Sequence, residues 1–352
     1  MRVLIRGAGV AGLTLAHELR ARAIHVEIAE TAARAGGGAS WFAGGMLAPW
    51  CERESAPDTV LTLGRTAADW WDATLPGHVI RKGTLVVAPP RDTGELSRFA
   101  ARTCAFDWLD ADEITALEPD LAGRFRKALF FRDEAHLDPR RAIAALHDRL
   151  QAIGVRFHFG AAPDFPDAGF DRVVDCTGSC AIGQAAKLRG VRGEMLMLET
   201  PEVRLSRPVR LLHPRIPLYI VPRGDRRFMV GATMIESDDP GPISARSLME
   251  LLNAAYALHP AFSEARVIET GAGVRPAYPD NLPRFEIDGS TIRVNGFYRH
   301  GFLLAPSIAR EVAAHLSGDW RGDIGQMPVG AASALHVPER VNAIPLQTGA
   351  NR

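Results

Sequence analysis

The chain has 352 residues, of which 47% are hydrophobic and 23% charged. This is the composition of a globular protein and, at this length, it predicts two domains. The 41 basic residues balance the 41 acidic ones, so charge gives no reason to expect a nucleic-acid partner or an anionic membrane surface. Apolar stretches fall short of the roughly 20 residues that a membrane span needs. Because a strand pattern begins at the N-terminus, we expect no signal peptide and a cytoplasmic protein.

The first residues predict a nucleotide-binding turn. A short apolar strand at 3–6 leads into Gly7-Ala8-Gly9-Val10-Ala11-Gly12, and a helical stretch follows. Gly7 permits the tight turn after the strand, Gly9 lets the backbone approach a pyrophosphate, and Gly12 lets the helix pack on the strand. The helix N-terminus offers free N–H groups and the positive end of its dipole to the phosphates.

An acid completes this pattern. A second strand at 25–30 ends at Glu30, about 20 residues beyond the glycines, as in dinucleotide-binding folds. Glu30 is expected to accept hydrogen bonds from ribose hydroxyls and to repel a 2′-phosphate, which argues against NADP. The alternative is an ordinary glycine-rich loop, but the order of strand, glycines, helix, strand and acid argues against it.

The middle of the chain continues the predicted nucleotide-binding domain and also contains elements outside it. The predicted elements are an ordered glycine-rich loop at 36–46, a helix over 56–75, a hairpin over 79–88, a helix over 139–152, and strands over 155–159 and 170–178. Trp41 and Phe42 are poor linker residues, so the loop is expected to pack against something flat. Pro139 occupies a favoured first-turn position. The strand at 170–178 returns the chain to the first sheet.

The pattern changes after residue 194. Closely spaced apolar strands at 195–198, 218–222 and 227–231 predict an antiparallel sheet, and a helix over 245–258 follows. The last residues, 326–352, read as a loose tail rich in Ala, Pro and Gly.

A second glycine turn lies near the C-terminus. A strand at 292–296 runs into Gly296-Phe297-Tyr298-Arg299-His300-Gly301-Phe302-Leu303-Leu304-Ala305-Pro306, and a helix is predicted over 304–316. A cofactor with two distant ends needs two such cradles. We therefore expect both turns to bind one extended cofactor.

The cysteines do not predict a metal site. Cys51, Cys104, Cys176 and Cys180 lack zinc-binding spacing, and we expect all four to be reduced thiols. None lies in the second glycine turn, so the cofactor is expected to be non-covalent.

These residues together resemble the D-amino-acid oxidase family of flavoproteins, and within it the glycine oxidases of thiamine biosynthesis. The resemblance covers nearly the whole chain. It rests on seven collinear segments: 7–12 with Glu30, 39–41 with 43–49, 191–194, 219–223, 230–234, 273–276 and 298–306.

The resemblance implies an α/β fold with two domains. A Rossmann-like FAD-binding domain would comprise 1–75, 140–190 and 271–325, and a substrate domain built on an antiparallel sheet would comprise 76–139 and 191–270. It also implies non-covalent FAD, a small amino-acid substrate, O2 as the acceptor and a homo-oligomer.

The same resemblance assigns site residues. Residues expected at the cofactor are Gly7, Gly9, Val10, Ala11, Gly12, Glu30, Ala39, Ser40, Gly44, Gly45, Met46, Pro163, Phe297, Tyr298, Arg299, His300, Gly301, Phe302 and Leu303. Arg275 is expected to bind the substrate carboxylate, with Arg299 and Tyr219 beside the substrate and Met234 in the pocket wall. Many of these oxidases have asparagine where His300 stands, and a histidine there either favours the reduced flavin anion or fills space.

The chemistry of an amino acid supports the role of Arg275. A carboxylate buried beside a flavin must be neutralised, and a planar arginine fork does so through two hydrogen bonds. The clamped carboxylate would place the α-carbon under flavin N5, so that hydride leaves without a protein base. No acid or base residue is therefore expected among the catalytic groups. Alternatives are a structural role for Arg275, an acid partner for Arg299, and a core position for Tyr219.

The predicted activity is FAD-dependent oxidation of glycine, and of small amines such as sarcosine or D-alanine. The products would be an imine, hydrolysed to glyoxylate and ammonia, and hydrogen peroxide; in thiamine biosynthesis the imine would feed thiazole formation. The alternatives are a dehydrogenase that passes electrons to a quinone or another carrier, a flavin-binding interaction protein without turnover, and an NAD dehydrogenase.

Overall fold

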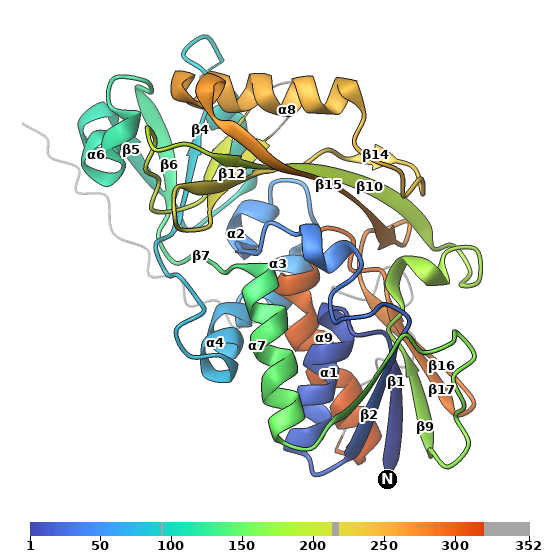
Figure 1. Ribbon diagram of the computed structural model, residues 1–352. Helices are drawn as coiled ribbons and strands as arrows, with labels where there is room; N and C mark the ends of the chain where they lie inside the picture. Colours follow the sequence, from blue (N-terminus) through green and yellow to red (C-terminus); the bar gives the residue numbers. More distant parts are fainter. Residues whose placement is uncertain (93, 213–217, 320–352) are drawn as a thin grey trace, which may run out of the picture.

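The computed structural model describes residues 1–92, 94–212 and 218–319 (Figure 1). The predicted C-terminal tail, 326–352, lies outside these residues. Two large sheets organise the described part of the chain, one of six strands and one of nine.

The six-stranded sheet has the order β16-β17-β9-β1-β2-β8. Its strands are β1 (Arg2–Arg6), β2 (His25–Glu30), β8 (Arg156–Phe159), β9 (Arg172–Asp175), β16 (Arg284–Asp288) and β17 (Thr291–Asn295). All neighbours pair in parallel except the edge pair β16 and β17. Helices α1 (Val10–Ala21), α7 (Pro139–Ala152) and α9 (Gly301–Ser317) lie side by side on one face (Figure 1).

The alternation of side chains along β1 explains how this sheet is covered. Val3 and Ile5 point to one face and join the core formed with the helices, whereas Leu4 points to the other face. There it packs with Ala29 and Val173 beneath the loop that follows β8. Both faces are thus covered, which is why the strand reads as a continuous apolar run.

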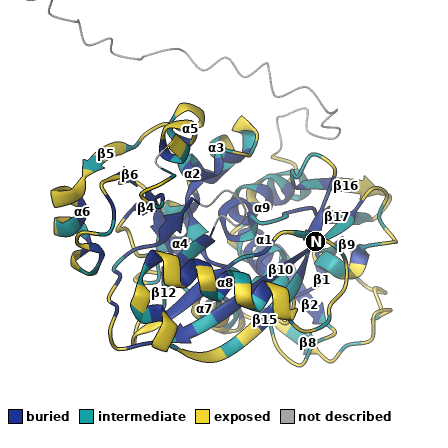
Figure 2. Cartoon of the chain, turned by 90° about the horizontal axis from the view of Figure 1, so that it is seen from above, coloured by how far each residue is buried: buried dark blue, intermediate teal, exposed yellow. Residues whose placement is uncertain are grey.

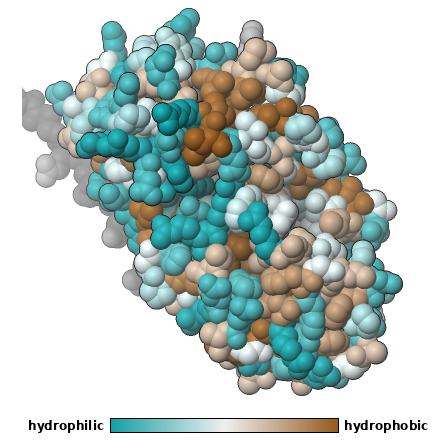
Figure 3. All heavy atoms as spheres, viewed as in Figure 1, coloured by the Kyte–Doolittle hydropathy of each residue, from teal (hydrophilic) through white to brown (hydrophobic). Residues whose placement is uncertain are grey.

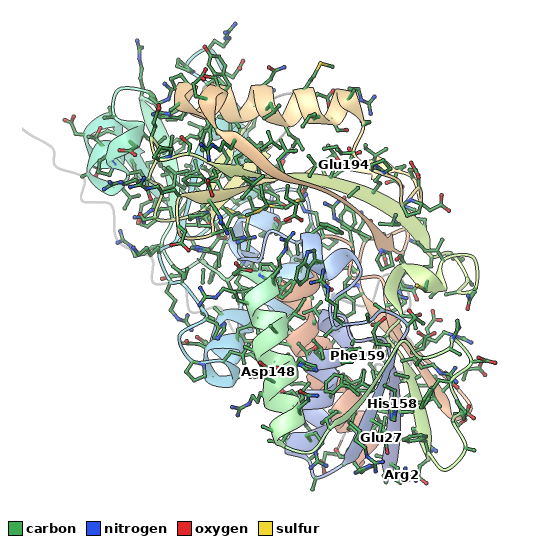
Figure 4. The ribbon with its side chains drawn as sticks, in the orientation of Figure 1. Arg2, Glu27, Asp148, His158, Phe159 and Glu194 are labelled. Atoms are coloured by element: carbon green, nitrogen blue, oxygen red, sulfur yellow. The ribbon has the colours of Figure 1, made fainter. Side chains whose placement is uncertain are left out.

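A buried carboxylate ties three strands of this sheet together. Glu27 of β2 accepts hydrogen bonds from Arg2 of β1 at 3.2 Å and from His158 of β8 at 2.9 Å, and Figure 4 labels the three side chains. Burial opposes ionisation, but hydrogen bonds from His158, His25 and Arg2 lower the pKa of Glu27 to about 2. This cluster is structural, because none of its members lines the cavity described below.

The nine-stranded sheet has the order β14-β10-β13-β12-β11-β4-β6-β5, with β15 also paired to β10. Its strands are β4 (Thr84–Val87), β5 (Asp107–Asp110), β6 (Lys127–Phe131), β10 (Arg189–Glu199), β11 (Val209–Leu211), β12 (Leu218–Pro222), β13 (Arg227–Gly231), β14 (Ile235–Glu236) and β15 (Arg266–Ala277). Helix α8 (Ala245–Leu258) packs Leu251, Ala255 and Leu258 into the core of this sheet. Its opposite side is exposed (Figure 2).

Shorter elements lie between the strands of the two sheets. They are β3 (Met46–Leu47), β7 (Ala135–His136), α2 (Pro49–Glu52), α3 (Asp58–Gly64), α4 (Ala67–Thr74), α5 (Gly94–Arg102) and α6 (Ala111–Leu117). In the described part of the chain, 3-10 helices occupy Ala39–Phe42, Pro119–Leu121, Gly178–Ala181 and Pro260–Glu264. The face of the molecule seen in Figure 3 mixes hydrophilic and apolar residues.

The predicted α/β class is confirmed, the second sheet is antiparallel except for the parallel pair β4 and β11, and two local predictions need correction. The helix predicted over 56–75 is two helices, α3 and α4. The hairpin predicted over 79–88 is wrong, because β4 pairs with β6 and β11 while Ile80 pairs with His136. Gly83 does not turn a hairpin; a Cβ there would lie 2.4 Å from the Phe130 ring, so the glycine permits a close approach to β6.

The domain boundaries proposed from the sequence fall inside strands. The limit at 190 lies within β10 and the limit at 270 within β15, and both strands belong to the nine-stranded sheet. These two long strands pair with each other along their length.

Candidate active site

A cavity of about 680 Å³ lies beyond the carboxyl ends of the parallel strands and extends to the nine-stranded sheet. Its lining begins at Gly7 and Glu30 and reaches Gly193 of β10, Tyr219 of β12 and Arg275 of β15. Open parallel sheets bind ligands at this edge, because the loops that follow the strands converge there. The cavity therefore joins the two glycine turns that the sequence singles out.

The first turn is built as its glycines predict. Gly7 has φ +101°, and a Cβ there would lie 2.5 Å from the carbonyl oxygen of Cys176. At Gly12 a Cβ would lie 2.0 Å from the carbonyl oxygen of Gly7, so α1 packs against β1 only because this residue is glycine. Gly12 does not line the cavity; expected at the cofactor, it instead supports the turn from behind.

Glu30 is fixed by the backbone at the end of β2. Its Oε2 accepts a hydrogen bond from the Ala8 N–H at 2.7 Å, and its Oε1 accepts one from the Ala32 N–H at 2.9 Å. A carboxylate has about four acceptor sites, so capacity for ribose hydroxyls remains. At the start of α1, the Val10 N–H donates to the hydroxyl of Ser40 at 3.2 Å.

The loop predicted to be ordered is held by arginines. The guanidinium groups of Arg34 and Arg140 both lie over the Trp41 ring, 3.7 Å and 4.6 Å from its centroid. Arg140 also pairs with Glu269 of β15 through two hydrogen bonds of 2.7 and 2.6 Å. The flat partner of Trp41 is therefore a pair of cations, and the loop is tied to the second sheet.

Arg223 fixes the next part of the same loop. Its guanidinium donates to the carbonyl oxygens of Gly44 at 2.8 Å, Ala43 at 3.2 Å and Leu137 at 3.2 Å. Burial lowers the pKa of Arg223 to about 10. The Tyr219 ring lies against this loop, since a Cβ at Gly44 would be 2.7 Å from it. Tyr219 thus faces the cavity instead of the core.

Arg275 lies flat against β10. A Cβ at Gly193 would be 1.9 Å from one of its guanidinium nitrogens, so only glycine leaves room for the side chain. Arg275 donates to the carbonyl oxygen of Thr233 at 3.1 Å. Among the described residues no carboxylate lies within ion-pair distance of it, and burial lowers its pKa. The remaining donors of the fork are available to an anion.

Arg299 has the acid partner that the sequence left open. Its Nη2 donates to Oε1 of Glu52 at 3.0 Å, and His300 Nε2 donates to Oε2 of the same carboxylate at 2.8 Å. Burial favours the neutral acid, yet Arg299 and His300 hold the pKa of Glu52 well below its usual range. Burial lowers the pKa of His300 despite that carboxylate. His300 is therefore a neutral donor at pH 7, with Nδ1 buried and without a partner among the described residues.

Met234 lies beside the main cavity and not in it. It is 47% exposed and lines a small adjoining pocket of about 20 Å³ together with Arg210, Tyr219, Arg275 and Arg299. Its sulfur accepts hydrogen bonds from the Tyr298 hydroxyl at 3.4 Å and from Arg299 at 3.5 Å.

The structure therefore brings the predicted residues together. Apart from Gly12 and Met234, every residue expected at the cofactor or the substrate lines the main cavity. Sequence analysis did not identify Glu52 or Arg210, and it noted Gly193 and the turn at 175–178 without assigning them to the site; all of these also border the main cavity or the small pocket. The structural role of Arg223 could have been predicted from the sequence, because an arginine directly after an apolar strand needs several hydrogen-bond acceptors.

The cavity suits a long dinucleotide cofactor. Its volume falls in the range of about 300–1,000 Å³ usual for ligand sites, and its lining includes Glu30 from the six-stranded sheet and Arg275 from the nine-stranded sheet. Free N–H groups at the start of α1 match a pyrophosphate, and Gly9 leaves its Cα side open except for the Ser40 hydroxyl 3.4 Å away. The residues present thus fit FAD.

Comparison with known proteins agrees with this geometry. Residues 2–315 match the family model DAO, FAD dependent oxidoreductase, and the chain belongs to this family of FAD-dependent enzymes. It is 69% identical over 316 residues to the putative thiamine biosynthesis oxidoreductase ThiO of Rhizobium etli, covering 90% of this chain and 96% of that protein. The predicted family, enzyme class and FAD cofactor are confirmed.

More distant relatives share the fold. The glycine oxidase of Bacillus licheniformis is 25% identical over 348 residues, which cover 90% of this chain and 93% of that one. The crystal structure of glycine oxidase from Geobacillus kaustophilus superposes with a TM-score of 0.75 at 24% identity, covering 92% and 96% of the two chains. Iminodiacetate oxidase from Chelativorans superposes with a TM-score of 0.77 at 24% identity, covering 90% and 96%.

Other site classes leave no trace in the described residues. Within 1–92, 94–212 and 218–319, no three His, Cys, Asp or Glu side chains group as metal ligands. In the same ranges no helix is long and apolar enough to cross a membrane. Cys51 and Cys176 are buried thiols, Cys104 and Cys180 are exposed thiols, and none forms a disulfide among the described residues.

Proposed function

We propose that this enzyme oxidises glycine, and small N-substituted or α-substituted amines such as sarcosine and D-alanine, to their imines with O2 as the final acceptor. The observation that carries the proposal is Arg275, a guanidinium held flat on Gly193, facing the cavity, with no carboxylate partner among the described residues. A cation kept in this state needs an anion from the substrate.

The surrounding residues define how the substrate would lie. The fork of Arg275 takes both carboxylate oxygens, and the Tyr219 hydroxyl, which lines the same cavity, donates to one of them. FAD, when bound, supplies the hydride acceptor. Most of the rate enhancement would then come from orientation of the substrate, because holding the α-carbon at a fixed distance from the hydride acceptor converts a bimolecular step into a unimolecular one. We assign no acid or base role to His300, whose Nε2 is occupied by Glu52.

The roles of the cofactor residues follow from their places along the cavity. We propose that Val10 and Ala11 meet the pyrophosphate, Glu30 the adenosine ribose and Pro163 the adenine. Residues 39–46 and 297–303 would then enclose the flavin. Met234 would close the small pocket behind the substrate, where it already contacts Arg299.

The pathway proposal rests on the relatives. The Rhizobium etli relative is named as a thiamine biosynthesis oxidoreductase, and similarity extends over 87% of this chain to half of a bifunctional ThiO/ThiG protein of Synechocystis. We propose that the imine of glycine feeds thiazole formation in thiamine biosynthesis.

Anaerobic reduction of the bound flavin tests this function. Glycine, sarcosine and D-alanine are each added to the holoenzyme without oxygen, and bleaching of the flavin absorbance is followed. The proposal predicts bleaching by at least glycine; an unchanged spectrum with all three would refute the substrate class. Admission of air in a stopped-flow instrument then tests the acceptor, since an oxidase reoxidises rapidly whereas a dehydrogenase that uses a quinone does not.

A further inference from the structure

Glu52 is a buried acid on the wall of the cavity, and the proposed reaction does not use it. It is the last residue of α2, is 8% exposed and lines the cavity. Three cationic or donor side chains converge on it: Arg299 at 3.0 Å, His300 at 2.8 Å and Arg210 at 3.6 Å.

The fold holds this carboxylate in place from both sides. Helix α2 is fixed at its start by Glu134, whose Oε1 accepts the Cys51 N–H at 2.7 Å. Arg210 of β11, itself 5% exposed, lies 5.1 Å from the centroid of the Phe99 ring. Glu52, Arg210 and His300 are buried, and the Arg299 side chain is 19% exposed.

The acids around the substrate end of the cavity pair with two of its three arginines. Glu52 pairs with Arg299 and lies 3.6 Å from Arg210. Glu54, whose Oε2 lies 3.9 Å from Arg210, also pairs with Arg102 at 3.3 Å. Among the described residues here, Arg275 remains without an acid. A single substrate carboxylate would supply the acid that Arg275 lacks.

A second carboxylate on the substrate would find a different environment. Arg299 lines the small pocket together with Arg275, and its Nη2 already donates to Glu52. A second anion would also face the negative charge of the buried Glu52 carboxylate, and like charges repel more strongly in a low-dielectric site than in water.

We propose that Glu52 determines substrate specificity: by occupying Arg299 and placing a fixed negative charge on the cavity wall, it confines the enzyme to amines that carry a single carboxylate. This inference rests on the proposed function, because it assumes that Arg275 binds the substrate carboxylate.

A matched pair of substrates tests the inference in the holoenzyme. Sarcosine is N-methylglycine and iminodiacetate is N-carboxymethylglycine, so both are secondary amines that differ in one carboxylate. In the E52Q variant Arg299 loses its anionic partner, and the ratio of kcat/KM for iminodiacetate to that for sarcosine is expected to rise at least about tenfold over wild type, which corresponds to about 1.4 kcal/mol. A ratio that stays the same or falls, with FAD bound, would overturn the proposal.

A second buried acid provides the control. Glu118 is 1% exposed and pairs with Arg207 at 2.7 Å, as Glu52 pairs with Arg299, but it does not line the cavity. E118Q is expected to keep the wild-type ratio. If E118Q shifts the ratio as far as E52Q does, the effect comes from loss of any buried acid and the proposal fails.

Inhibitor binding to the wild-type holoenzyme keeps the test independent of folding and of turnover. Acetate and malonate are titrated against the flavin spectrum, and malonate is expected to bind at least about tenfold more weakly. Equal or tighter binding of malonate would contradict the inference even if E52Q does not fold. If wild type oxidises none of glycine, sarcosine and D-alanine, the proposed function fails, whereas the acetate and malonate titrations still decide the charge selectivity.

Discussion

Replacement of Arg275 by glutamine removes the cation that we propose binds the substrate carboxylate. Among the described residues, Arg275 makes one hydrogen bond, to the Thr233 carbonyl oxygen at 3.1 Å, and no ion pair. R275Q therefore leaves no protein carboxylate unpaired. The substrate loses a charge-assisted fork, for which we take about 3 kcal/mol after desolvation.

This free energy corresponds to roughly a hundredfold weaker binding of the carboxylate. We expect the KM for glycine and the inhibition constant of acetate to rise together by about that factor, while FAD stays bound, because both report the same carboxylate contact. R275K keeps the charge but lacks the planar fork, so it should fall between wild type and R275Q.

A surface arginine controls for the loss of charge alone. Arg227 is exposed on β13 and pairs with Glu199 at 3.2 Å, so R227Q should leave both constants near wild type. The reasoning is refuted if R275Q binds acetate as tightly as R227Q does. Loss of FAD from R275Q would instead place Arg275 in the cofactor site.

Two further changes test other parts of the structure. Burial raises the pKa of Glu134 from 4.5 to about 7; between those pH values the folded protein holds this proton while the unfolded chain releases it, so the stability of the wild type falls as pH rises. The free energy of unfolding of E134Q minus that of the wild type should therefore increase by about 2.5 kcal/mol from pH 5 to pH 8. A difference in urea unfolding that does not depend on pH would contradict this. In G12A a Cβ would lie 2.0 Å from the Gly7 carbonyl oxygen, a clash worse than the overpacking that costs about 1–3 kcal/mol, so we expect G12A to lose bound FAD. The control G94A adds a Cβ with nothing within 4 Å and should retain FAD. A G12A variant that is fully loaded with FAD would refute the packing role.

The sequence predicted the elements whose signals are local. Pro139 marks the first residue of α7, and the alternation of apolar residues places β1 and β2 in the sheet. The glycine turns could be placed beside one another because the carboxyl ends of parallel strands share one edge. Family resemblance, and not periodicity, supplied Arg275 and Tyr219.

What the sequence could not predict depends on contacts between distant residues. Glu52 stands between Cys51 and Arg53 without a motif, and its partners Arg299 and His300 lie 247 and 248 residues further along the chain. The false hairpin at 79–88 has the same origin, since β4 finds both of its partners elsewhere. Local sequence patterns specify helices and strands, whereas the burial of a charged side chain depends on how the two sheets pack together.

The most direct test of the account is a crystal structure of the FAD-bound enzyme with acetate, a carboxylate that cannot be oxidised. The account predicts that both oxygens of acetate lie within hydrogen-bond distance of the Arg275 guanidinium, with the methyl group toward the flavin and Arg299 still paired with Glu52. Acetate bound to Arg299 instead, or an Arg275 side chain turned toward solvent, would contradict it.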